Sequence, residues 1–231
     1  MIFRQLFERE SYTYTYIIGC EKTRQAVIID SVKAQVPQYL QLLTELNVQL
    51  RYILDTHTHA DHITGAGMLR EATGAITLLG EQAQSACVSQ PLHHEDLIAV
   101  GELSLQAIHT PGHTDDSYSF ILREGGQTYV FTGDTLLIRG TGRTDFQNGN
   151  AQQQYTSLFT QLLQLPDNTW VYPGHDYQGF TCSTIGEEKA FNPRLQVADA
   201  AEYVQIMQNL NLPNPKLMDI AVPKNRACGN D

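Results

Sequence analysis

The N-terminal part of the chain has the two-residue period of β-strands. Residues 11–19, SYTYTYIIG, alternate between polar and apolar side chains, and residues 25–30, QAVIID, form a β-branched run. Such stretches are typical of strands. We therefore expect the first 30 residues to form strands, the last of which ends at Asp30.

The period then changes to that of a helix. Residues 36–47 place apolar side chains on one helical face, namely Val36, Tyr39, Leu40, Leu43 and Leu46. Residues 51–55, RYILD, form a compact apolar run again. This order predicts a strand, a helix and a second buried strand that leads into the loop THTHADHITG at residues 56–65.

The rest of the chain continues this alternation. Gly125 and Gly126 join two apolar runs within residues 115–135, which predicts a hairpin. Residues 151–165 have one apolar helical face, which predicts a helix. The other expected elements are strands within residues 75–80, 103–113 and 168–175, a short helix over 81–89, and a last helix over 199–210 before a Pro-rich tail.

Two mixed sheets packed face to face, with the amphipathic helices outside, would bury all of these apolar faces. The pattern therefore predicts an α/β (α+β) fold of two mixed sheets with outer helices. A chain of 231 residues is long enough to bury such a core. No stretch has the composition of a linker, so we expect a single domain over residues 1–231 with a short C-terminal extension.

Charge and hydropathy narrow the possible partners. The chain has 15 Lys and Arg against 25 Asp and Glu, a formal net charge of −10 at pH 7, so we expect no nucleic-acid partner. Its apolar runs fall short of the roughly 20 residues that span a bilayer, so we expect no membrane partner. The start, MIFRQLFERESYTY, lacks the apolar core of a secretion signal, which predicts a cytoplasmic protein, or an organellar one after processing.

The cysteines predict no disulfide framework. Cys20, Cys87, Cys182 and Cys228 are scattered without a CxxC pair, so we expect reduced thiols. Cys228 lies in a Gly-containing tail, RACGND, and is the cysteine that we expect to be exposed.

Side chains that bind metals follow the points where strands are expected to end. They are His57, His59, Asp61 and His62 after RYILD, His113 after LQAIHTPG, Asp134 after TYVFTG, and His175 after NTWVYPG. Strand ends on one edge of a sandwich can converge in space. Imidazole nitrogens and carboxylate oxygens are ligands for zinc, iron or manganese. For His93, His94 and His109, outside this pattern, we expect ordinary surface or hydrogen-bonding roles.

The motifs HTHADH, PGHT, TGDT and PGH, in this order, resemble those of the metallo-β-lactamase superfamily. The resemblance implies an αββα sandwich with a metal centre at one edge. By comparison with the dinuclear members, His57, His59 and His113 would be first-site ligands. Asp61, His62 and His175 would bind a second metal, and Asp134 would lie between the two.

Three longer blocks, FTGDTLLIRGTGRTDFQNG, YPGHDYQGFTCSTIGEEKAFNPRL and NLNLPNPKLMDIAVPKNRACG, resemble the persulfide dioxygenases of that superfamily. This resemblance implies one Fe(II) per chain, held by the catalytic residues His57, His113 and Asp134 in a 2-His-1-carboxylate arrangement. His59, Asp61, His62 and His175 would then form an outer shell or hold a second metal. The implied reaction oxidises glutathione persulfide with O2 and water to sulfite and glutathione, and the implied assembly is a homodimer.

Glutathione carries two carboxylates, so an acidic protein must concentrate positive charge locally to bind it. Arg143 in GRTDF and Arg194 in NPRL are the leading candidates, because guanidinium groups bind carboxylates bidentately. An ion pair between Arg143 and Asp145 is the competing explanation. The remaining candidates are Arg139 and Lys189, which rank behind, Tyr177 for substrate binding or packing, and Thr114 and Asp145 as outer supports of the ligands.

The alternative function is that of glyoxalase II, a hydroxyacylglutathione thioester hydrolase of the same superfamily. Such an enzyme would use two metals and a bridging hydroxide, and the retained second-site residues permit it. The motif GRTDF and the short C-terminal part favour the dioxygenase. Other small-molecule lactonases of the superfamily are a weaker third alternative. A non-catalytic metal-binding or redox-sensing module is an alternative of a different class, although structural zinc sites are normally closed by four protein ligands and rich in cysteine or histidine.

Overall fold

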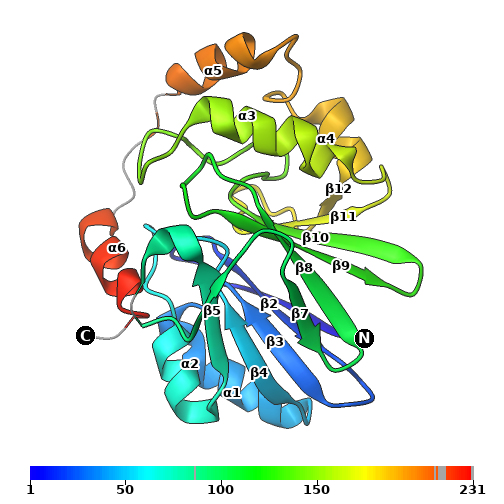
Figure 1. Ribbon diagram of the computed structural model, residues 1–231, viewed down its shortest axis with the longest axis vertical. Helices are drawn as coiled ribbons and strands as arrows, with labels where there is room; N and C mark the ends of the chain where they lie inside the picture. The colour runs from blue at the N-terminus through cyan, green and yellow to red at the C-terminus, as the bar shows by residue number, and fades with distance from the viewer. Residues whose placement is uncertain (86, 211, 213–216, 230–231) are drawn as a thin grey trace.

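Two six-stranded mixed sheets pack face to face in the computed structural model of the protein, with helices on both outer faces (Figure 1). The structure describes residues 1–85, 87–210, 212 and 217–229. The predicted α/β sandwich of two mixed sheets is therefore confirmed. Within these ranges, none of the helices combines the length and apolar character that crossing a membrane requires.

The first sheet is built from the N-terminal strands in sequence order. Its members are β1 (Ile2–Phe7), β2 (Tyr14–Gly19), β3 (Gln25–Ile29), β4 (Gln49–Leu54), β5 (Ile76–Gly80) and β6 (Gln90–Leu92). The pairs from β1 to β3 are antiparallel, and the pairs from β3 to β6 are parallel. The parallel pairs β3–β4 and β4–β5 follow helical crossovers. The helical period of residues 36–47 predicts the first crossover, whereas the helix of the second was not predicted.

The second sheet has the spatial order β12-β11-β10-β9-β8-β7. Its members are β7 (Leu97–Val100), β8 (Leu103–His109), β9 (Tyr118–Glu124), β10 (Gln127–Gly133), β11 (Trp170–Pro173) and β12 (Ser183–Thr184). The hairpin predicted at Gly125 and Gly126 is confirmed, since β9 and β10 pair antiparallel across this turn. The crossover from β10 to β11 is parallel.

The helices cover the outer faces of the sheets (Figure 1). Those beside the first sheet are α1 (Val36–Glu45) and α2 (Ala66–Thr73), and those beside the second are α3 (Ala151–Thr160), α4 (Ile185–Phe191) and α5 (Ala200–Gln208). A further helix, α6 (Met218–Arg226), lies near α2. Short 3-10 turns occupy Lys33–Gln35, Glu81–Ala83 and Leu162–Gln164.

The apolar side chains form three layers. Neighbouring residues of β2 show the division, because Ile18 packs between the sheets and Ile17 packs toward α1. Phe120 and Phe131 of the second sheet fill the same central layer as Ile18, while Leu158 of α3 belongs to the third layer. Strand β2 is buried on both faces for this reason, and its position within the first sheet is tightly determined.

The helices differ from the predictions in several places, and α2 and α4 were not expected. The helix expected over residues 81–89 is reduced to the 3-10 turn Glu81–Ala83, and residue 86 lies outside the described ranges. Helix α6 was not expected after residues 199–210, because Pro223 within it lacks an N–H donor. Tertiary contacts compensate, since Ala221 and Asn225 are buried. Residues 213–216 of the predicted Pro-rich tail lie outside the described ranges.

The prediction of reduced thiols is wrong for two of the cysteines. Cys87 and Cys228 form a disulfide between positions 141 residues apart, and both are largely covered rather than exposed. The sequence spacing held no sign of the pair, because the contact arises only when the segment after α6 folds back beside α2. Cys20 and Cys182 are free.

We predict that Cys228→Ser lowers the midpoint of thermal unfolding. The lost cross-link constrains a long loop, and such a constraint contributes up to about 5 kcal/mol through the unfolded chain. Differential scanning calorimetry of the oxidised protein measures the shift. The control is Cys182→Ser, which replaces a free cysteine and leaves the disulfide intact. An unchanged midpoint, in a wild-type protein shown by mass spectrometry to be oxidised, would contradict the stabilising role.

Candidate metal centre

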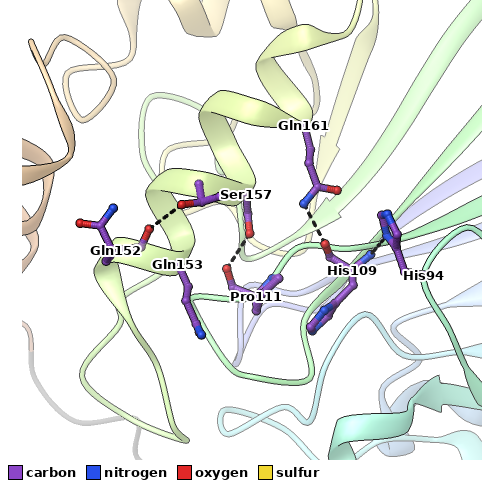
Figure 2. A pocket seen from close by; sticks show the side chains of 8 residues that line it. His94, His109, Pro111, Gln152, Gln153, Ser157 and Gln161 are labelled. Atoms are coloured by element: carbon purple, nitrogen blue, oxygen red, sulfur yellow. Dashed lines mark hydrogen bonds between the residues drawn. The ribbon is translucent and has the colours of Figure 1, made fainter.

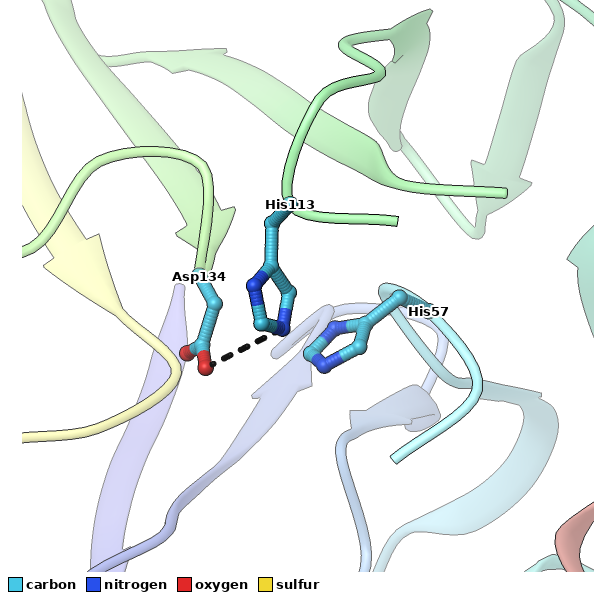
Figure 3. Close-up of side chains that lie close together, drawn as sticks. All are labelled: His57, His113 and Asp134. Atoms are coloured by element: carbon cyan, nitrogen blue, oxygen red, sulfur yellow. Dashed lines mark ion pairs between the residues drawn. The ribbon is translucent and has the colours of Figure 1, made fainter. Parts of the chain in front are cut away.

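The predicted ligands come from four strand ends at one edge of the sandwich. His57 follows β4, His113 follows β8, Asp134 follows β10 and His175 follows β11. One donor atom from each of His57, His113 and Asp134 lies within 4.8 Å of the other two. Figure 3 shows these three side chains converging from separate segments, with His113 Nε2 3.6 Å from Asp134 Oδ2.

In both histidines of this set, a hydrogen bond at Nδ1 orients the ring. The Nδ1 atom of His113 lies 2.7 Å from the carbonyl oxygen of Arg143 and donates to it. The Nδ1 atom of His57 lies 3.0 Å from the hydroxyl of Thr56, which in turn donates to Asp30 at 2.9 Å. These contacts leave both Nε2 atoms available as ligands, the usual arrangement at metal sites.

Burial favours the form of His57 that can bind a metal. It lowers the pKa of His57 well below the ordinary value, and the neighbouring His59 and His113 lower it further. A neutral imidazole presents a lone pair, whereas an imidazolium does not. Two neutral imidazoles and one carboxylate are a suitable donor set for a ferrous ion.

The carboxylate of Asp134 is oriented by His175. The Nδ1 atom of His175 donates to Asp134 Oδ1 at 2.6 Å, and its Nε2 atom donates to Asp61 at 2.9 Å. Burial disfavours the charged ring, but Asp134 and Asp61 outweigh burial and raise the pKa of His175 well above the ordinary value. With both nitrogens donating, His175 supports Asp134.

A second group of potential ligands lies beside the first. Donor atoms of His59, Asp61 and His62 also lie within 4.8 Å of one another. His59 Nε2 lies 3.2 Å from Asp30, and among the described residues neither His59 Nδ1 nor His62 Nε2 has a hydrogen-bond partner. Burial opposes the charged form of His59, but Asp30, Asp61 and Asp55 raise its pKa to about 9.

The sequence patterns did not identify two residues of this region, Asp30 and Thr13, as candidates for the site. Asp30 ends the run QAVIID at a strand exit, so the rule that identified the other ligands applies to it as well. Thr13 had no comparable signal, because it belongs to the alternating stretch SYTYTYIIG. Its hydroxyl lies among Asp61, His62 and His175.

The segment after α5 holds the histidine-rich loop in place. The side-chain amide of Asn225 in α6 donates to the carbonyl oxygens of His59 and His62, each at 2.8 Å. Its side-chain oxygen accepts from the backbone N–H of Thr64 at 2.9 Å. One buried side chain thus satisfies three backbone groups of the loop, which cannot pair within a helix or sheet there.

Close backbone approaches require glycine at two positions. A Cβ atom on Gly142 would lie 2.7 Å from His113 Nδ1, and one on Gly174 would lie 2.8 Å from Asp134 Oδ1. The N–H of Gly142 also donates to the carbonyl oxygen of Asp134 at 2.6 Å. Both glycines therefore let backbone pass directly behind the ligands.

The candidate substrate residues have different surroundings. The guanidinium of Arg143 binds both carboxylate oxygens of Asp145, at 2.7 and 2.8 Å, and lies 4.3 Å from the ring centre of Phe146. Arg194 donates to the carbonyl oxygen and hydroxyl of Thr141, and burial lowers its pKa. Both arginines brace the segment after Asp134 in this structure.

Tyr177 lies at the rim of the metal centre. Its side chain is 63% exposed, and its ring is stacked parallel to that of His175 with centroids 6.1 Å apart. The ring of Tyr12 lies 5.2 Å away on the same rim. A largely exposed side chain beside His175 keeps Tyr177 a candidate for contact with substrate.

The remaining candidates make local contacts. Thr114 bonds Ser117 through both its hydroxyl and its N–H. Arg139 pairs with Glu188, and Lys189 pairs with Asp167 at 2.6 Å. The support expected from Asp145 reaches the ligands indirectly, because Asp145 anchors the side chain of Arg143 while the carbonyl of Arg143 accepts from His113.

A surface cavity of about 420 Å³ lies away from these ligands, beside α3 (Figure 2). His94, His109 and Gln161 line it, and they bond within the protein. His94 Nδ1 accepts from the backbone N–H of His109 at 3.1 Å, and Gln161 donates to the carbonyl oxygen of His109 at 3.0 Å. The described residues that line the cavity include no carboxylate or arginine, so the cavity does not share the chemistry of the metal centre.

The sequence and the fold define the class of protein. Residues 9–83 and 88–175 match the family model described as the metallo-beta-lactamase superfamily. These ranges include every ligand-type residue described above. The chain therefore belongs to the metallo-β-lactamase superfamily.

Relatives named persulfide dioxygenase match nearly the whole chain. The mitochondrial persulfide dioxygenase ETHE1 of Homo sapiens is 43% identical over 229 residues, which are 99% of this chain and 89% of that protein. The crystal structure of ETHE1 from Myxococcus xanthus covers 100% of both chains at 56% identity, with a TM-score of 0.96. A Schizosaccharomyces pombe protein named as a probable hydroxyacylglutathione hydrolase is more distant, at 34% identity over 89% of this chain and 90% of its own.

We predict that Gly142→Ala weakens metal binding at least tenfold. The added methyl group would push against the ring of His113 and the backbone of Asp134, and changes around metal ligands typically cost 10- to 100-fold in affinity. Competition with a chelator measures the affinity. Gly140→Ala is the matched control, because its Cβ would meet nothing closer than 3.9 Å. Equal affinities of the two variants would contradict the steric argument.

Proposed function

We propose that this protein is a persulfide dioxygenase, which oxidises glutathione persulfide with O2 and water to sulfite and glutathione with one Fe(II) per chain. The observation that carries the proposal is the convergence of donor atoms from His57, His113 and Asp134. Relatives named persulfide dioxygenase, which match 99% of this chain, support the same activity. A 2-His-1-carboxylate set leaves coordination positions open, as oxygenases require.

The bound ferrous ion would supply the redox chemistry, and the protein would supply binding and orientation. In this proposal His57 and His113 hold the ion through Nε2, while Thr56 and the carbonyl of Arg143 keep their rings in position. Asp134 contributes the third ligand and is oriented by His175. His59, Asp61 and His62 belong to the outer shell.

A dinuclear thioester hydrolase is the second candidate function. The specific observation in its favour is the group His59, Asp61 and His62, whose donor atoms also lie within 4.8 Å of one another. The two functions differ in metal count and in oxygen consumption, and both are measurable on the purified protein.

Substrate binding is proposed for Arg143, Arg194 and Tyr177. The terminal carboxylates of glutathione persulfide need a cationic partner in a chain of charge −10. Arg143 is the first choice, because its backbone carbonyl accepts from His113 and the residue therefore lies next to a proposed ligand. Tyr177 would line the rim beside His175.

We also propose a homodimer and a cytoplasmic location. Sedimentation equilibrium of the metal-loaded protein tests the first. The second has a direct chemical test, because a reducing cytoplasm would keep Cys87 and Cys228 as thiols rather than as the disulfide of this structure. Alkylation of thiols in intact cells before lysis distinguishes the two states.

We predict that His113→Ala abolishes oxygen uptake with glutathione persulfide, because one of the three ligands is lost. The wild-type protein, purified anaerobically, should contain about one iron per chain and consume O2 while releasing sulfite. Its hydrolysis of S-lactoylglutathione is the parallel assay. Two metals per chain with thioester hydrolysis and no oxygen uptake would replace the dioxygenase by the hydrolase.

We predict that Arg143→Ala raises the KM for glutathione persulfide about tenfold, because about one charge-assisted hydrogen bond to the substrate is lost. Asp145→Asn is the matched control, because it breaks the same ion pair but keeps the guanidinium. If Arg143 only braces its loop, both variants change the kinetics equally. If it binds substrate, only Arg143→Ala raises KM.

A further inference from the structure

The hydroxyl of Thr13 lies among Asp61, His62 and His175, the residues that would bind the second metal in a dinuclear member of the superfamily. Its Oγ1 atom is 3.2 Å from Asp61 Oδ2, 3.2 Å from His62 Nδ1 and 3.1 Å from His175 Nε2. Thr13 comes from the segment between β1 and β2 and is completely buried. The hydroxyl therefore occupies a point that faces two imidazole nitrogens and a carboxylate oxygen at once.

These three atoms are a typical donor set for a transition metal, but their spacing is that of hydrogen bonds. Asp61 Oδ2 lies 2.8 Å from His62 Nδ1 and 2.9 Å from His175 Nε2. Ligand atoms bound tetrahedrally at about 2.0–2.2 Å to one ion lie roughly 3.3–3.6 Å apart. A metal at this point would have to separate the three groups and displace the hydroxyl.

The backbone holds Thr13 where it is. Thr13 forms a bridge with His175, and the N–H of the next residue, Tyr14, donates to the carbonyl oxygen of Gly174 at 2.8 Å. On the other side, the carbonyl oxygen of Thr13 accepts from the N–H of Glu8 at 2.9 Å. Thr13 therefore moves only together with His175 and the β1–β2 segment.

The side chain is held as firmly as the backbone. Ser11 lies 2.7 Å from the hydroxyl of Thr13, and the hydroxyl of Ser11 itself donates to Glu8 at 2.7 Å. A β-branched side chain has few alternative rotamers, and these contacts favour the one observed. The hydroxyl is thus a fixed part of the cluster.

We propose that the Thr13 hydroxyl, hydrogen-bonded within Asp61, His62 and His175, takes the place of a second metal ion and makes this a one-metal centre. The inference rests on the proposed dioxygenase centre and deepens it by naming the residue that sets the metal count. At His57 the hydroxyl of Thr56 contacts Nδ1 rather than Nε2, and at His113 the carbonyl oxygen of Arg143 does the same, so the described contacts leave both Nε2 atoms available. His57, His113 and Asp134 therefore bind the ion, and the cluster around Thr13 supports it through the contact of His175 with Asp134.

The test is the metal count of Thr13 variants. Wild-type protein, Thr13→Ala and Thr13→Ser are stripped with a chelator, loaded anaerobically with excess Fe(II) or Co(II), desalted and analysed by elemental mass spectrometry. We expect one metal per chain in the wild type and in Thr13→Ser, which keeps the hydroxyl, and two in Thr13→Ala. The absorption spectrum of the Co(II) form should show the additional site.

A double variant locates the added ion. Thr13→Ala combined with Asp61→Asn should return to one metal per chain, because the second site then lacks its carboxylate. Circular dichroism establishes that each variant is folded. A single metal per chain in folded Thr13→Ala overturns the inference. A second tightly held metal in the wild type also overturns it, and this measurement needs no variant.

These outcomes separate the inference from the proposed function. A wild type that holds two metals yet consumes O2 with glutathione persulfide removes the role of Thr13 and leaves the dioxygenase. A wild type that holds one metal, gains a second in Thr13→Ala and shows no oxygen uptake removes the dioxygenase and leaves the role of Thr13.

Discussion

The hydrogen bond between His175 Nδ1 and Asp134 Oδ1, 2.6 Å long, joins the two groups of potential ligands into one structure. Its energy depends on burial, since a charged pair removed from water interacts strongly only when both partners are well positioned. Asp61 completes the arrangement by accepting from the other nitrogen of His175. His175 and Asp61, which are potential ligands themselves, therefore determine the orientation of the proposed ligand Asp134.

The same requirement for pairing explains why segments distant in sequence meet at this edge. The loop after β4 contains backbone groups that no strand or helix partner satisfies, and Asn225 of α6 supplies three of the missing hydrogen bonds. The carbonyl oxygen of Arg143 does the same for the ring of His113. The disulfide between Cys87 and Cys228 then ties the segment after α6 to the connection between β5 and β6. Stability of the C-terminal segment and geometry of the metal centre are coupled through these contacts.

One set of seven ligand-type residues is compatible with two chemistries. A dinuclear hydrolase needs both groups to bind ions and to share a hydroxide. A one-metal oxygenase needs a single ion with open positions and a surrounding shell that orients its ligands. In this chain the distinction depends on small geometric features, namely which nitrogen of each ring is already hydrogen-bonded and whether a hydroxyl lies at the second position. Residue identity at the ligand positions does not determine either feature.

The sequence by itself determined the two mixed sheets, the positions of α1, α3 and α5, and the candidate ligand residues at the strand exits. Periodicity reports which face of an element is apolar, and the ends of buried strands are where His57, His113, Asp134 and His175 occur. Only the tertiary structure decided the roles of Thr13, Asn225 and the Cys87–Cys228 pair, and it revealed that α6 forms despite Pro223. These features depend on contacts between segments far apart in the chain. Such contacts leave no local pattern, because each partner alone resembles an ordinary strand, helix or loop residue.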